Sequence, residues 1–413
     1  MFIEQVCLID GLYLFTQRRL YIILHTMSIY LDWAATAVPD PAILKNIYEC
    51  STRFYGNPSS VHQAGQEASA VLEECRTRCA AALGVKKEEV FFTSGGTESD
   101  NIVLLSLLRK PSRGTVLVSA IEHPAILEPA AVLAENGYKV AYLKPGADGI
   151  IKQGTLEKAL TPDTKLVTVM AVNNETGAVQ PVHQLAAAVN NYAQECGHKI
   201  HFHCDAVQGT GKIKLDFADP NIHSWAISAH KIRGPRGAGI LVLKNTIQTM
   251  VRGGGQESGI RPGTENTSAI YGMTLALEKA LADLDKNSAH AYAIMDTLLE
   301  ALAKNNTYTI IPDNRKPGDA HYSPYVLSLA ATPIPAEVMA RTLDDKGICV
   351  GTGSACFNRK KGQSKTLAAM GVADDISFSR IRVSIGSTTT EEELEQFIKT
   401  LDQESSILRK SLR

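Results

Sequence analysis

Short runs of β-branched and aromatic residues recur between residues 90 and 243, bounded by Gly, Pro, Asn or Asp. Segments with the periodicity of amphipathic helices separate most of the early runs, for example 125–137 and 182–197. Strands that alternate with helices predict a mostly parallel, doubly wound sheet covered on both faces. The expected strands are VFFT (90–93), TVLVS (115–119), KVAYL (139–143), LVTVMA (166–171), IHFHC (200–204), WAIS (225–228) and GILVL (239–243).

The pattern changes in the last third of the chain. A long amphipathic stretch, 276–305, is expected to be helical, and a shorter mixed set of strands and helices follows it. We expect a large domain over 46–285 and a smaller C-terminal α/β domain over 286–413, which also takes in the early segment 28–45. The expected elements of the smaller domain are TIIP (309–312), YVLSLA (325–330), ICVGTG (348–353), RIRVSIG (380–386) and a helix over 390–404.

The first residues are apolar, but Glu4, Asp10 and the pair Arg18 and Arg19 interrupt them well short of the ~20 residues of a membrane span. A secretory signal would place its positive charge before the apolar core rather than in its middle. Because Met27 precedes a fresh strand-like start, we interpret residues 1–27 as an N-terminal extension that is not necessarily native. An amphipathic docking helix is the alternative.

Charge and cysteine content limit the partners and the compartment. The 42 basic and 43 acidic residues leave a net charge of −1, so no global field attracts nucleic acid or an anionic membrane. The eight cysteines are scattered through the chain, which is typical of reduced thiols in a cytosol. We therefore expect a cytoplasmic protein that binds neither nucleic acid nor membranes.

Candidate chemistry follows the strands directly, because ligands of doubly wound sheets bind at the carboxyl ends of the strands. Lys231 ends one apolar strand and Asp205 ends the preceding one. A lysine Schiff base with an acidic partner for the pyridinium is typical of pyridoxal phosphate. Gly95, Gly96 and Thr97, at the start of a helix, could hold its phosphate. Taken singly, a solvated lysine and an N-cap turn are the commoner interpretations.

Two apparent motifs predict no site. QGTGKIK (208–214) is similar to a phosphate-binding Walker loop, but Ala206 stands at its first glycine and Ile213 at its metal-binding hydroxyl. CGHKIHFHC (196–204) has the residue types of a zinc site, but a strand sends alternate side chains to opposite faces. We expect no metal.

From about Ser28 to the C-terminal helix the chain resembles the NifS/IscS-like cysteine desulfurases, class V members of the fold-type I pyridoxal-phosphate enzymes. The resemblance implies a homodimeric transferase that converts L-cysteine to L-alanine. It also implies a sulfur acceptor, such as an iron-sulfur scaffold or a tRNA-thiolation protein. The motifs that carry it, in this order, are YLDWAAT, FTSGGTESDN, EHPA, NNETG, DAVQ, SAHKIRGPRG, GGGQESGIRPGTEN, GSAC and RVSIG.

The resemblance also implies roles for single residues. Lys231 would bind the cofactor covalently and later move the Cα proton, and His123 would stack on the ring and exchange protons with the substrate thiol. Cys356 would take the sulfur as a persulfide, and Arg382 would bind the substrate carboxylate. The remaining expected contacts are Asp205 at the ring nitrogen, Asn174 and Gln208 at the ring hydroxyl with Asn174 also at the substrate, and Gly96, Thr97, Ser228 and His230 at the phosphate, joined there by Thr264 from the other subunit.

Cys356 follows the small residues GTGSA, which allow a mobile loop. The nearby Arg359, Lys360 and Lys361 either lower the pKa of its thiol or are solvated surface charge. Two alternatives stay open. One is a selenocysteine lyase or another class V lyase or aminotransferase, in which Cys356 is a spectator, and the other is a catalytically silent scaffold.

Overall fold

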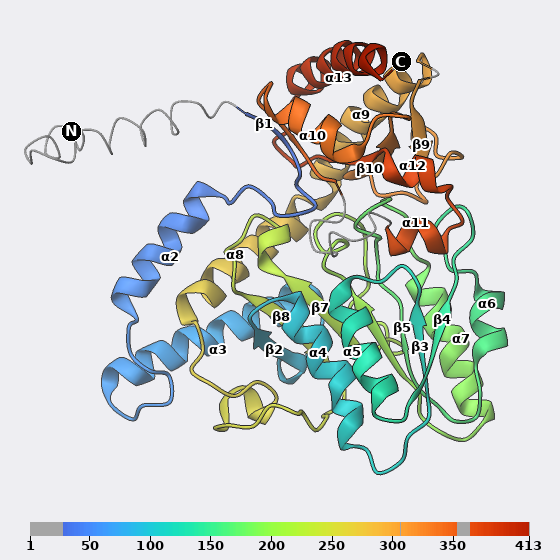
Figure 1. Ribbon diagram of the computed structural model, residues 1–413. Helices are drawn as coiled ribbons and strands as arrows, with labels where there is room; N and C mark the ends of the chain where they lie inside the picture. The colour runs from blue at the N-terminus through green and yellow to red at the C-terminus, as the bar shows by residue number, and fades with distance from the viewer. Residues whose placement is uncertain (1–27, 306, 353–363, 413) are drawn as a thin grey trace, which may run out of the picture.

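A computed structural model describes residues 28–305, 307–352 and 364–412 (Figure 1). Seven strands form the large sheet in the order β2-β8-β7-β6-β5-β3-β4. The strands from β3 to β7 pair in parallel, and β8 runs antiparallel to both of its neighbours. The mostly parallel sheet is therefore confirmed. Its strands are β2 (Val90–Thr93), β3 (Thr115–Ser119), β4 (Lys139–Leu143), β5 (Thr164–Thr168), β6 (His201–Asp205), β7 (Ser224–Ser228) and β8 (Gly239–Leu243).

All seven expected segments form strands. The largest difference is at β5, which ends at Thr168 instead of residue 171. The carbonyl of Ala171 accepts a hydrogen bond from the N–H of Gln180, which lies in the turn after the strand. The predicted N-terminal extension, residues 1–27, lies outside the described residues.

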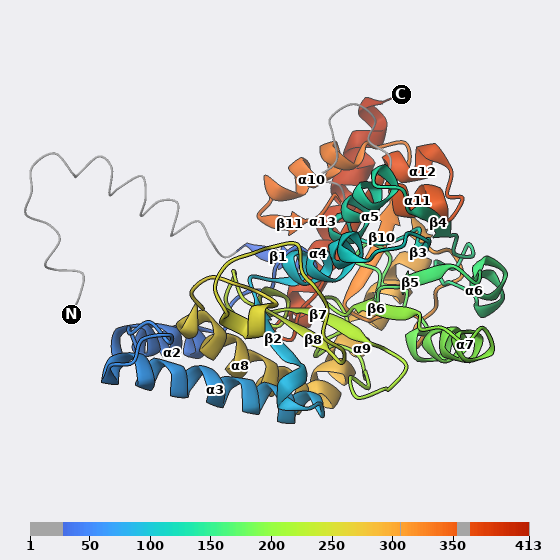
Figure 2. The same cartoon turned by 90° about the horizontal axis from the view of Figure 1, so that it is seen from below.

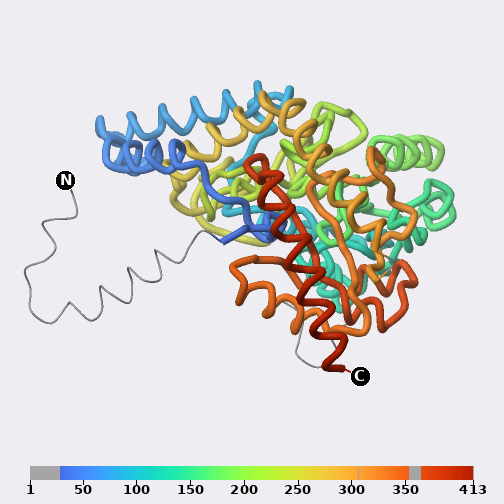
Figure 3. Tube along the Cα trace, turned by 90° about the horizontal axis from the view of Figure 1, so that it is seen from above, coloured from blue at the N-terminus to red at the C-terminus, as the bar shows by residue number. Residues whose placement is uncertain are grey.

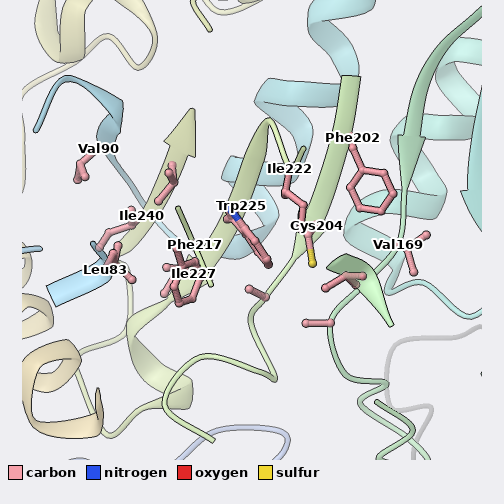
Figure 4. Packing of buried hydrophobic residues seen from close by; sticks show 14 of the residues in the cluster. Leu83, Val90, Val169, Phe202, Cys204, Phe217, Ile222, Trp225, Ile227 and Ile240 are labelled. Carbon is pink, nitrogen blue, oxygen red and sulfur yellow. The ribbon is translucent and has the colours of Figure 1, made fainter. Parts of the chain in front are cut away.

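Helices cover both faces of this sheet (Figure 2). One core cluster joins the sheet to α4 (Gly96–Ser106) and α5 (Pro124–Glu135). A second, larger cluster lies on the other face, where Trp225 and Phe202 are fully buried (Figure 4). The helices on that face are α3 (Gln63–Leu83), α7 (Val182–Glu195) and α8 (Thr267–Ala282), with α2 (Pro41–Arg53) packed on α8 and α6 (Gln153–Ala159) beside α7.

The helical stretch 276–305 is divided into two helices. α8 ends at Ala282 and α9 (Leu284–Ala303) begins after Asp283, which separates them. α9 leads into the C-terminal elements, which surround a separate core. They are β9 (Thr309–Ile311), β10 (Val326–Ala330), α10 (Ala336–Asp344), β11 (Ile348–Val350), α11 (Lys365–Ala369), α12 (Asp374–Phe378), β12 (Arg380–Ser384) and α13 (Glu391–Ser411).

The start of the described chain joins these C-terminal elements, as Figure 3 shows by the meeting of blue and red segments. β1 (Ile29–Leu31) pairs in parallel with β11, and β12, β10 and β9 form an antiparallel sheet. Single bridges from Asp32 to Ser384 and from Gly351 to Arg382 connect the two small sheets. β1 thereby brings an early segment to β12, although the predicted domain boundaries stay a prediction.

Over the described ranges, every helix is too short or too polar to cross a bilayer. The same residues contain no group of three or more His, Cys, Asp or Glu side chains placed to hold a metal ion.

Candidate active site

A cavity of about 540 Å³ lies at the carboxyl ends of the central strands, where the large sheet meets the segments after β1 and β11. Thr264 is exposed on the loop before α8, outside this cavity, and Cys356 lies outside the described residues. The structure brings together the other predicted residues, which are Gly96, Thr97, His123, Asn174, Asp205, Gln208, Ser228, His230, Lys231 and Arg382.

Lys231 lies in a single helical turn, η3 (Ala229–Lys231), directly after β7. Its Nζ donates to the carbonyl oxygens of Ala34 at 2.6 Å and Ala35 at 2.8 Å. Burial, and then the positive charge of Arg382, lower the pKa of the Lys231 amine to about 8. Roughly a tenth of the amine is therefore uncharged at pH 7, and a nucleophilic lysine requires this uncharged form.

Asp205 ends β6, the strand next to β7. It is 5% exposed, and its Oδ1 accepts a hydrogen bond of 2.8 Å from the N–H of Val207. Burial, and then the neighbouring Asp100, raise the pKa of Asp205 to about 7. No lysine or arginine of the described chain forms an ion pair with Asp205, so a cationic ligand group would complete this site.

His123 is the N-cap residue of α5. Its Nδ1 accepts a hydrogen bond of 3.1 Å from the N–H of Ala125, which leaves Nε2 as the ring nitrogen that carries the proton of a neutral imidazole. Burial lowers the pKa of His123, against an opposing effect of Asp205. The ring therefore enters the cavity uncharged, with one N–H donor.

The first turn of α4 forms one wall of the cavity. Gly95 has φ of +153°, and a Cβ atom on Gly96 would lie 2.5 Å from Cγ2 of Val207. Only glycine therefore fits where the backbone N–H groups of this helix begin, and such groups bind anions. His230 also lines the cavity. Its Nδ1 lies 3.1 Å from the hydroxyl of Thr36, and burial followed by Lys231 lowers the pKa of His230 to about 4.

Arg382 extends from β12 into the cavity. Its Nη2 lies 2.8 Å from Oδ1 of Asp32, and its Nη1 donates to the carbonyl oxygen of Asn174 at 3.0 Å. Its Nε is buried and has no hydrogen-bond partner among the described residues. Arg382 lines the cavity, and a guanidinium there fits a carboxylate, which binds arginine through paired N–H groups.

Gln208 is held by hydrogen bonds at both ends of its amide. Its Nε2 donates to the carbonyl oxygen of Ala34 at 2.8 Å, and its Oε1 accepts from Nζ of Lys212 at 2.8 Å. Lys212 is buried, and burial followed by Lys231 lowers the pKa of its amine to about 7. The carbonyl of Ala34 thus accepts from both Gln208 and Lys231, which joins the segment after β1 to the site.

Sequence reasoning missed several residues of this cavity. Asp32 stands in the motif YLDWAAT and pairs with Arg382, and Glu175 stands in NNETG. Glu175 pairs with the buried Arg380 and accepts a 2.7 Å hydrogen bond from Ser364. The signal that could have identified Asp32 and Glu175 was their position inside motifs at the ends of strands. Their partners lie more than 180 residues away in the chain, so the motifs alone could not supply them.

Comparisons with known proteins agree on one family. The profile of the family described as Aminotransferase class-V matches residues 29–397. "Cysteine desulfurase, mitochondrial" of Saccharomyces cerevisiae is 34% identical over 393 residues, which cover 93% of this chain and 76% of that protein. "Cysteine desulfurase IscS" of Dictyoglomus turgidum is 34% identical over 91% of this chain and 94% of its own length. A solved "NifS-like protein" superposes with a TM-score of 0.83 at 33% identity, covering 93% of this chain and all of that one.

Proposed function

This chain belongs to the class V aminotransferase family as a pyridoxal-phosphate-dependent cysteine desulfurase, and we propose that it converts L-cysteine to L-alanine and holds the sulfur as a persulfide on Cys356. The observation that carries the proposal is the convergence of Lys231, Asp205 and His123 in one cavity with the guanidinium of Arg382. A nucleophilic amine, a buried carboxyl, a neutral imidazole and a carboxylate-binding group are the parts that this reaction requires.

The cavity fits pyridoxal phosphate on two observations. Gly96 lets Val207 pack closely against the first turn of α4, whose backbone N–H groups can bind a phosphate where Gly96 and Thr97 line the cavity. The buried Asp205 lacks a cationic partner in the described chain. When bound, this cofactor supplies an electron sink that makes the Cα–H of an amino acid acidic. The residues that would hold it are Lys231 through a covalent bond, Asp205 at the ring nitrogen, Asn174 and Gln208 at the ring hydroxyl, and Gly96, Thr97, Ser228, His230 and Thr264 of the partner subunit at the phosphate.

The protein groups then have separate tasks. Arg382 binds the substrate carboxylate and so fixes the orientation of Cα, while Asn174 lies beside it. The Lys231 amine removes the proton from Cα, a step that its lowered pKa favours. His123, uncharged with its proton on Nε2, exchanges a proton with the substrate thiol.

Sulfur would pass to Cys356 from a substrate that is activated by the electron sink of the bound cofactor. The Cys356 thiolate forms a bond to the substrate sulfur while the Cβ–S bond breaks, and a proton takes the place of sulfur on Cβ. The products are a persulfide and alanine, so atoms and electrons balance without an external oxidant. Thr352, which lies four residues before Cys356 in the sequence, lines the cavity.

Replacement of Cys356 tests the proposal. The Cys356→Ala variant is expected to produce no alanine from cysteine, whereas Cys196→Ala, which removes an exposed thiol elsewhere, is expected to retain full activity. Mass spectrometry after exposure to cysteine should find one added sulfur on Cys356. Alanine production by Cys356→Ala would favour a selenocysteine lyase or another class V lyase. Protein that stays colourless after pyridoxal phosphate is added would favour the catalytically silent scaffold.

The persulfide implies an acceptor outside the active site. We propose that the protein acts as a homodimer and passes sulfur to an iron-sulfur scaffold or a tRNA-thiolation protein. A cytoplasmic location is part of the same proposal. Transfer of radiolabelled sulfur from the loaded protein to each purified acceptor distinguishes the two pathways.

A further inference from the structure

A chain of hydrogen bonds runs from the cavity floor into the interior of the large sheet. Oδ1 of Asp100, on α4, lies 3.0 Å from Nε2 of His203. Nδ1 of His203 lies 2.8 Å from the hydroxyl of Ser224 on β7, and that hydroxyl lies 2.7 Å from Nε2 of His201. Asp100 is 1% exposed and His203 is fully buried, whereas His201 is partly exposed at the far end.

Asp100, where this hydrogen-bonded chain begins, belongs to a cluster of three buried carboxyl groups. The three, Asp100, Glu122 and Asp205, all line the cavity. None of them forms an ion pair with a described lysine or arginine, and Oδ2 of Asp100 has no hydrogen-bond partner there. Burial raises the pKa of Asp100 and of Glu122 well above the usual value. Negative charges in one buried cluster repel one another, so ionisation of one of these groups disfavours ionisation of the other two.

Two proton arrangements fit these distances and give every N–H and O–H along them an acceptor. A third, with the proton of Asp100 on Oδ2, would leave that hydroxyl buried without an acceptor. If Asp100 is ionised, Nε2 of His203 donates to it and Nδ1 accepts from Ser224. If Asp100 is protonated, it donates to Nε2 of His203, whose Nδ1 donates to Ser224, whose hydroxyl donates to His201. The second arrangement leaves every member uncharged, which the burial of Asp100, His203 and Ser224 favours, and burial lowers the pKa of His203 to about 4.

We propose that Asp100, His203, Ser224 and His201 form an uncharged hydrogen-bonded chain in which Asp100 stays protonated. These are positioning residues, and they leave Asp205 as the one carboxyl of the cluster that ionises. The proposal rests on the proposed cofactor site, because there the ionised Asp205 would contact the ring nitrogen of pyridoxal phosphate.

The placement of Asp205 supports this role. His203 and Asp205 are two residues apart on β6, so both side chains point to the face that α4 covers. A neutral Asp100 removes the charge that would oppose ionisation of Asp205, and His123 faces Asp205 from α5. The other titratable groups around this hydrogen-bonded chain are Glu122 at the cavity, and Lys110 and His223 near His201. His203, a member of the chain, also acts on His201.

The test begins with the wild-type protein without cofactor. Nitrogen-15 NMR of labelled histidine at neutral pH is expected to show the Nδ1–H tautomer of His203. Infrared difference spectra between wild type and Asp100→Asn are expected to lose one protonated carboxyl band. An Nε2–H tautomer, or no lost band, would overturn the proposal. Neither measurement depends on the cofactor, and the tautomer needs no variant that could fail to fold.

A second measurement uses the protein loaded with pyridoxal phosphate. In Asp100→Asn one neutral donor replaces another, so the pH midpoint of the bound cofactor's absorbance is expected to move by less than about 0.3 pH unit. If Asp100 is ionised in the wild type, the same change removes a nearby charge and moves the midpoint by about one unit or more. Asp205→Asn distinguishes failure of the proposed cofactor site from failure of the proposed proton arrangement. If it leaves cofactor affinity unchanged while the tautomer is as expected, the cofactor site fails and the proton arrangement stands.

Discussion

At the scale of the residue, Arg382, the proposed substrate-binding group, acts electrostatically on the amine of Lys231. Lys231 and Arg382 come from separate sheets and meet in one cavity. The guanidinium acts twice in the proposed reaction, since it binds the carboxylate and also lowers the pKa of the Lys231 amine. One substitution should therefore change two measurable quantities.

We predict that Arg382→Gln raises the KM for cysteine by about 10- to 100-fold, because hydrogen bonds to charged groups contribute about 1.5–3 kcal/mol. The Lys231 amine is protonated below its pKa of about 8 and free above it. Loss of the arginine charge removes one of the two causes that lower this pKa. The cofactor-free protein is loaded with pyridoxal phosphate, and its absorbance is recorded against pH. In Arg382→Gln the midpoint of the absorbance change should lie at a higher pH than in the wild type.

Arg409→Gln, on the surface of α13, is the matched control and should leave both quantities unchanged. A midpoint that does not move in Arg382→Gln would contradict the coupling, even if the KM rises.

At the scale of the element, the start of α4 determines whether an anion can approach the cavity wall. The helix begins at Gly96, and Val207, from the turn after β6, packs directly over that glycine. The site therefore depends on a close contact between a helix end and the turn after a strand. Sequence spacing alone does not reveal this contact.

We predict that Gly96→Ala lowers the affinity for pyridoxal phosphate by at least about tenfold, because the added Cβ would lie 2.5 Å from Val207 and displace the first turn. Titration of cofactor-free protein by fluorescence measures this. Gly154→Ala, in α6, is the control, since no atom lies within 4 Å of its added Cβ. The control should keep its affinity and unfold at an equal or slightly higher temperature.

At the scale of the whole molecule, a buried ion pair holds the loop that carries Thr264. Arg76, on α3, donates to both oxygens of Glu257 at 2.7 and 2.8 Å, and the Glu257 side chain is fully buried. The same carboxylate accepts a 2.7 Å hydrogen bond from the N–H of Phe92 on β2. The loop is thereby attached to both a helix and a strand of the large sheet.

We predict that Arg76→Ala lowers the free energy of unfolding by about 3–5 kcal/mol, because it leaves Glu257 buried without its partner. Lys214→Ala is the control. Its ion pair with Asp285 is almost fully exposed, so the change should cost less than about 1 kcal/mol. Chemical denaturation measures both values, and equal losses in the two variants would show that burial of the pair contributes nothing.

The proposed dimer makes a separate prediction about complete sites. Thr264→Asp would place a negative charge beside the phosphate of the partner subunit, and Lys231→Ala removes the amine of its own subunit. Each variant alone should be inactive. After subunit exchange, mixed dimers should regain activity, because one of their two sites takes Lys231 and Thr264 from unaltered positions. Mixtures that stay inactive after mass spectrometry has shown mixed dimers would exclude the shared site.

The sequence by itself determined the strands of the large sheet, because alternation is a local property of the chain. The roles of the site residues come from strand-end motifs and a family resemblance, and they stay predictions. It placed Lys231 and Asp205 at adjacent strand ends, and the structure has them there. The tertiary structure decided what the sequence could not. Asp32 meets Arg382 across 350 positions, and Asp100 meets His203 across 103. Which carboxyl ionises depends on burial and on neighbours that only folding brings together.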